Sequence, residues 1–129
     1  MAQSPEEWLK QADYDMDTAQ AMFDTSRHFY AVFMCHLSLE KALKGLYWAR
    51  LKKIPPKTHS LVWLSEQLRL APAKEHADFF YLLNRLSVTT RYPEDIGKLQ
   101  QEFSESRTRN LLIEGKDALR WLKSELPRS

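Results

Sequence analysis

Apolar residues recur at steps of three and four along almost the whole chain, and this helical spacing constrains the fold more than any other feature. Only three glycines occur in 129 residues, whereas all-β chains need glycine in many of their turns. No alternating apolar–polar run is long enough to indicate a strand. The sequence therefore predicts an all-α protein, and its length favours a single domain over residues 1–129.

About five helices account for the pattern. Ser4 is a good N-cap and Pro5 suits the first helical position, so the first helix starts there and ends near Thr25. Paired prolines at 55–56 end the second helix. The other expected ranges are about 27–53, 60–70, 73–87 and 104–126, with a loop or short helical turn at 93–103. Two long antiparallel helices, a shorter pair and a closing helix predict an up-and-down bundle.

The second helix is the most apolar. Val32, Cys35 and Leu39 begin one broad stripe, and Phe33 and Leu37 cover much of the remaining surface. A helix that is apolar on most sides lies at the centre of a bundle, or buries one face in the core and another against a partner. Cys35 is the only cysteine, so we expect a buried thiol rather than an internal disulfide.

The net charge of the chain is +2, which neither supports nor excludes a nucleic-acid partner. The first fifteen residues are polar and acidic, which does not fit a signal peptide. No apolar run approaches the roughly 20 residues that span a bilayer. We therefore expect a cytoplasmic protein that does not bind membranes.

A polar seam runs along the second helix. His36, Glu40 and Lys44 follow at steps of four and so stack on one side. One interpretation is an ordinary surface pair between Glu40 and Lys44, with His36 near the edge of the core. The other is a seam that points into a cleft or across a dimer interface. Two ligands do not make a zinc site, so no metal or cofactor is predicted.

Two other charged groups have competing interpretations. Basic residues gather around the end of the second helix, where Tyr47 and Trp48 lie among them; cations with aromatic rings can hold phosphate and stack bases, and they also suit a helix C-terminus. The basic residues are Lys41, Lys44, Arg50, Lys52, Lys53 and Lys57.

The acidic run Asp13, Asp15 and Asp17 lacks the glycine of a calcium loop, so we interpret it as a solvated acidic face.

The sequence lacks the motifs of conventional nucleotide enzymes and hydrolases. No serine has a glycine-rich elbow around it, and there is no glycine-rich phosphate loop. His59 lies in "KTHSL", where it is either a local capping residue or a residue of a cleft. Arg91 lies in "VTTRYPED", where Pro93 biases Tyr92 away from helical angles and so ends a helix.

Five segments together resemble the HEPN domain family (higher eukaryotes and prokaryotes nucleotide-binding). In order they are "WLKQADYDMDTAQAMF", "RHFYAVFMCHLSLEKALKGLYW", "IPPKTHSLVWL", "TTRYPED" and "LIEGKDALRWLKSEL". The resemblance covers nearly the whole chain and implies an all-α bundle that commonly forms a homodimer. It also implies one of two roles: partner of a small nucleotidyltransferase, often in a toxin–antitoxin pair, or metal-independent ribonuclease.

The chain departs from the ribonuclease pattern, in which a histidine follows an arginine by four to six residues. Arg91 has no histidine after it, Arg50 precedes His59 by nine residues, and Arg69 precedes His76 by seven. We therefore favour a binding module for a nucleotide, RNA or a partner nucleotidyltransferase. A ribonuclease that uses Arg91 with His36 or His59, and a purely structural interaction bundle, are the alternatives.

The residues expected to line one binding cleft come from the polar seam, the loop after it and the Arg-Tyr-Pro element. An arginine there can hold a phosphate and a histidine can move a proton. The predicted binding residues are Arg91, Tyr92, His36, Glu40, Lys41, Lys44 and His59, and the catalytic candidates among them are Arg91, His36 and His59.

Overall fold

A computed structural model describes residues 4–126 of the chain. Every regular element among these residues is helical, which confirms the all-α prediction. The six helices are α1 (Pro5–Asp24), α2 (His28–Leu51), α3 (Leu61–Gln67), α4 (Lys74–Arg91), α5 (Ile96–Glu102) and α6 (Glu105–Ser124).

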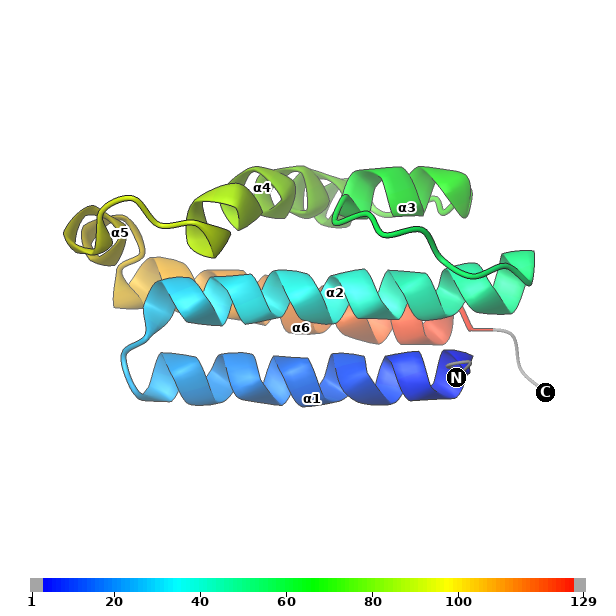
Figure 1. Ribbon diagram of the computed structural model, residues 1–129, viewed down its shortest axis with the longest axis horizontal. Coiled ribbons are helices and arrows are strands. Elements are labelled where there is room, and N and C mark those ends of the chain that lie inside the picture. The colour runs from blue at the N-terminus through cyan, green and yellow to red at the C-terminus, as the bar shows by residue number, and fades with distance from the viewer. Residues whose placement is uncertain (1–3, 127–129) are drawn as a thin grey trace.

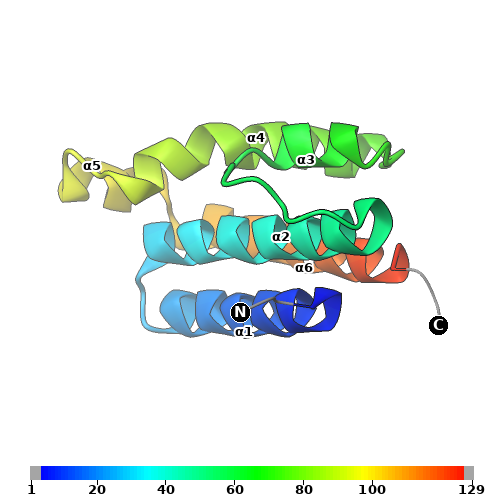
Figure 2. The same ribbon diagram turned by 45° about the vertical axis from the view of Figure 1, so that its right-hand side comes forward.

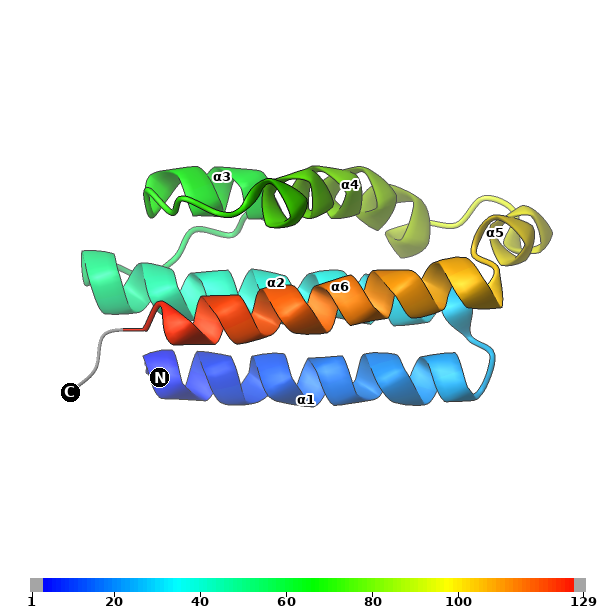
Figure 3. The same ribbon diagram turned by 180° about the vertical axis from the view of Figure 1, so that it is seen from behind.

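The long helices pack side by side around α2. Helix α1 runs antiparallel to α2 on one side, α3 and α4 lie on the opposite side, and α6 covers a third side of α2 (Figures 1 and 3). The turned view in Figure 2 shows the same layers, with α5 beyond the end of α4. The segment between α2 and α3 returns along α2 before α3 begins (Figure 1). Helix α2 is thus the central helix that its all-round apolar sequence predicts.

Close packing of α2 against α6 depends on small side chains. Cys35 is fully buried with a free thiol, and burial raises its pKa to about 12. Gly115 of α6 faces it, and a Cβ added there would overlap Cys35 Sγ while keeping ordinary contacts with Met16 and Phe79. The missing side chain at this position therefore allows α6 to lie against α2.

The end of α4 differs most from the sequence prediction, and the segment after it takes the helical form rather than the loop, the two forms that the sequence left open. Helix α4 continues to Arg91, four residues beyond the expected end at Ser87, because Thr90 is buried and its hydroxyl donates to Leu86 O at 3.1 Å. The helix stops only at Tyr92, the residue that Pro93 holds away from helical angles. Residues 96–102 form a true helix, because the Asp95 carboxylate accepts from Lys98 N at 3.1 Å and caps it.

None of the helices among residues 4–126 is both long and apolar enough to cross a membrane.

Candidate functional site

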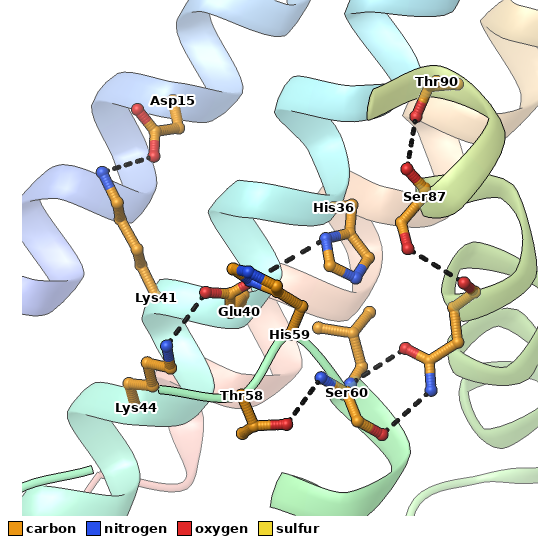
Figure 4. A network of polar contacts seen from close by, with 12 residues as sticks. Asp15, His36, Glu40, Lys41, Lys44, Thr58, His59, Ser60, Ser87 and Thr90 are labelled. Atoms are coloured by element: carbon orange, nitrogen blue, oxygen red, sulfur yellow. Dashed lines mark hydrogen bonds and ion pairs between the residues drawn. The ribbon is translucent and has the colours of Figure 1, made fainter. Parts of the chain in front are cut away.

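A buried carboxylate is the centre of the polar seam on α2. Glu40 is 4% exposed. Its Oε2 accepts from Lys44 Nζ at 3.0 Å, and its Oε1 accepts from His59 Nδ1 at 3.0 Å (Figure 4). The predicted Glu40–Lys44 contact is therefore present, but it is buried, which contradicts the surface-pair interpretation. A carboxylate removed from water needs such cationic and hydrogen-bonding partners.

The segment that carries His59 is fixed by α4. Asn84 of α4 accepts from Leu61 N at 2.9 Å and donates to Ser60 Oγ at 3.1 Å. Ser60 Oγ in turn accepts from Trp63 N at 3.0 Å and caps α3. The backbone next to His59 is thereby held in place, so that its imidazole lies over Glu40 while 59% of the side chain stays exposed.

His36 lies deeper in the same seam. It is fully buried, and neither ring nitrogen has a hydrogen-bond partner among the described residues. Its Nδ1 lies 3.9 Å from Glu40 Oε1 (Figure 4). Burial lowers the pKa of His36 to about 4; the Arg91 charge also lowers it, and the Glu40 charge opposes this shift. His36 is therefore neutral at physiological pH.

Arg91, the last residue of α4, contacts α2 at Phe33. Its guanidinium lies over the Phe33 ring, 4.8 Å from the ring centroid. One terminal nitrogen, Nη2, is buried without a partner, and no carboxylate between residues 4 and 126 forms an ion pair with Arg91. The side chain is thus a positioned cation with hydrogen-bond donors left free.

Neutral His36 should make stability depend on pH. The unfolded chain takes up a proton near pH 6.5 while the folded chain does not until about pH 4, so this contribution to stability is present above 6.5 and is lost as pH falls toward 4. Between about pH 7 and about pH 5 the loss is on the order of 2 kcal/mol. Urea unfolding of wild type and His36→Leu at both pH values measures it, since carboxylate effects common to both proteins cancel. An equal pH dependence in the two proteins would contradict it.

The structure separates two predicted residues from the others. His36, Lys44 and His59 lie around Glu40, and Arg91 contacts Phe33 of the same helix. Lys41 instead turns toward α1 and pairs with Asp15 at 2.9 Å (Figure 4). Tyr92 is 73% exposed and lies in a different groove, between the end of α4 and α5.

The two charged groups also differ from their expected form. Asp15 is buried, so the acidic run is not a uniformly solvated face. Half of the basic group at the end of α2 is paired with acids: besides the Lys41 and Lys44 pairs, Arg50 pairs with Glu125 at 2.8 Å. No periodic pattern indicates the Asp15 and Glu125 partners, because each lies far along the chain on another element.

Two contributors to the site are missing from the sequence prediction. Asn84 fixes the loop beside His59, and Phe33 supplies the surface on which Arg91 lies. Phe33 is recognisable as part of the seam by its spacing from His36 and Leu37, but its contact with Arg91 joins residues 58 positions apart. Asn84 carries no local signal, since a single asparagine in a helix is uninformative.

Comparison with known proteins gives a family and a fold. A family model described as the HEPN domain matches residues 5–124. The crystal structure of TT1696 from Thermus thermophilus is similar, with a TM-score of 0.83, 23% identity, and coverage of 95% of this chain and 98% of that one. The structure of ST0689, described as an archaeal HEPN homologue, has a TM-score of 0.76 and 21% identity over 98% of this chain and all of that one. No curated protein matches.

Proposed function

The chain belongs to the HEPN domain family, and from this premise we propose that it is a binding module whose Arg91 holds the phosphate of a nucleotide or an RNA strand. The observation that carries the proposal is the state of Arg91: its guanidinium is stacked on Phe33, one of its nitrogens is buried, and none has an acidic partner in the described chain.

An anion is the ligand that best satisfies this arrangement. Nη2 itself is buried, but Arg91 as a whole is only half-buried, so a phosphate oxygen would accept from its other, accessible donors. The planar guanidinium matches two phosphate oxygens at once. His36 is neutral and so adds no competing charge, and because it is fully buried it does not contact the ligand itself.

The Glu40 network has a supporting role in this proposal. Glu40 is already neutralised by Lys44 and hydrogen-bonded to His59, so it does not compete for Arg91. The same contacts hold the 52–60 segment against α2, and Asn84 joins that segment to the helix that ends in Arg91. The seam therefore positions the binding surface rather than binding the anion itself.

Binding to single-stranded RNA should depend on Arg91 and not on a neighbouring arginine. We expect Arg91→Gln to weaken binding by about tenfold or more, equivalent to losing one charged hydrogen bond. Arg85→Gln, an exposed position on the same helix with the same charge change, is the matched control. Fluorescence anisotropy with a labelled oligonucleotide measures both. Equal losses of RNA affinity in the two variants would indicate nonspecific charge attraction and would contradict the proposal.

A second candidate function, metal-independent RNA cleavage, is favoured by one observation. His59 Nδ1 donates to the buried Glu40 carboxylate while most of its ring is exposed, and a carboxylate that orients an imidazole suits proton transfer. The same RNA samples, incubated with chelator and run on a denaturing gel, test it. Cleavage by wild type that is lost in His59→Gln would support it, and intact RNA with wild type would exclude it.

We also propose that the module forms a homodimer and pairs with a nucleotidyltransferase. The support is membership of a family in which both associations are common. Light scattering behind a sizing column should give about twice the chain mass of 15.2 kDa; the mass of a single chain at tens of micromolar would contradict the dimer.

A further inference from the structure

We propose that the groove between the end of α4 and α5 docks a short basic amphipathic helix of a partner protein. The groove has a volume of about 420 Å³ and is separate from the Arg91–Phe33 contact. Its lining residues are Val88, Thr89, Tyr92, Glu94, Asp95, Lys98, Leu99 and Glu102.

An apolar stripe on α4 leads into this groove. Tyr81, Val88 and Tyr92 are 59%, 66% and 73% exposed. Tyr81 and Val88 are seven residues apart and so share one face of α4, with Arg85 between them, and Tyr92 follows directly after the helix. This is the spacing by which one helix packs along another. Exposed large apolar side chains that line up in this way are typical of a surface that a partner covers.

The charges that line the groove indicate that the partner is basic. Glu94 and Asp95 have no ion pair among residues 4–126, and Lys98 is the only basic residue in the lining. Glu102 lies 3.6 Å from Arg107. The rim is therefore acidic although the whole chain carries +2. An acidic rim repels phosphate and attracts lysine or arginine, so nucleic acid does not fit here.

The apolar stripe and the acidic rim together fit a partner helix that has leucine-like residues on one face and basic residues beside them. Its apolar face would cover Val88 and Tyr92, and Leu99, which is buried at the base of the groove, would limit how deeply it enters. Its basic residues would approach Glu94 and Asp95. Such docking of an amphipathic helix into an apolar groove is a common mode of peptide recognition.

A labelled peptide of about twelve residues with leucine and lysine at helical spacing is the probe, and the same peptide with glutamate in place of lysine is its control. We expect only the lysine peptide to bind. Glu94→Lys should weaken its binding by about tenfold or more, and Glu75→Lys, at the exposed start of α4 and away from the groove, should have little effect. Val88→Ser should weaken binding more than Ile113→Ser, a similarly exposed residue on α6.

Three results would overturn the proposal. The first is no binding of the lysine peptide at millimolar concentration. The second is equal losses for Glu94→Lys and Glu75→Lys, because that would indicate attraction to net charge alone. The third is a dimer in solution that Val88→Ser dissociates, because a second copy of the chain would then occupy the groove. RNA binding by these variants should be unchanged or stronger. A failure of the docking proposal is therefore distinguishable from a failure of the proposal that Arg91 binds phosphate.

Discussion

Replacing Gly115 by alanine should lower the free energy of unfolding by about 2–3 kcal/mol, although alanine is the better helix former by about 1 kcal/mol. The added Cβ would overlap Cys35 Sγ, and both atoms lie on rigid helices in the centre of the bundle. Overpacking of this kind is relieved when a helix moves or when the Cys35 thiol leaves its rotamer, and both cost stability in a close-packed core. Urea unfolding followed by circular dichroism measures the change.

Two controls test whether the overlap with Cys35, rather than any substitution in α6, lowers the free energy of unfolding. Cys35→Ala removes the sulfur, so the double variant Cys35→Ala/Gly115→Ala should be more stable than Gly115→Ala alone. Gly97→Ala is the control glycine, because a Cβ there meets only Asp95 Oδ1 at 3.4 Å; it should be neutral or slightly stabilising. Strictly additive effects of the two single substitutions would show that the overlap is not the reason.

Replacing Glu40 by alanine should cost about 3–5 kcal/mol, because it leaves the Lys44 ammonium without its partner in a buried site. It also removes the acceptor of His59 and so loosens the 52–60 segment. Chemical denaturation again gives the free energy. Glu40→Gln, which keeps the shape and one acceptor, should cost less than Glu40→Ala.

Two further variants test whether burial causes this effect. The pair Lys74–Asp78 has the same spacing of four but is largely exposed, so Asp78→Ala should scarcely change stability. In Glu40→Leu/Lys44→Met the unpaired charge is gone, and most of the stability should return. If Glu40→Ala behaves like Asp78→Ala, the seam is not a buried network.

The helices that the sequence predicts well are those whose own residues decide them. Helix α1 begins at Pro5 with Ser4 as its cap, as expected, and α2 is central because it is apolar on most sides. The end of α4 is less predictable. Thr89 and Thr90 weaken the local helical preference, yet burial of Thr90 against the bundle extends the helix to Arg91. Tertiary contacts outweigh local preference there.

The candidate site was predictable only in part, and for a similar reason. Spacing along one helix is enough to place His36, Glu40 and Lys44 together, since neighbours at steps of four share a face. Whether that face is buried depends on the 52–60 segment, which Asn84 holds against it from a distant helix. The sequence places Lys41 on the same surface, but its Asp15 partner lies on α1, and no local pattern shows this.

The most direct test of the account is whether a phosphate contacts Arg91. AMP and adenosine share a base and a ribose and differ in the phosphate, so they are matched ligands for side-chain ¹⁵N–¹H spectra of arginine. We predict that AMP shifts the Arg91 Nε–H resonance to saturation, that adenosine does not, and that Arg85 Nε–H stays unchanged with both. Equal shifts with adenosine and AMP, or AMP shifts confined to Arg85 and other exposed arginines, would contradict an anion site at Arg91.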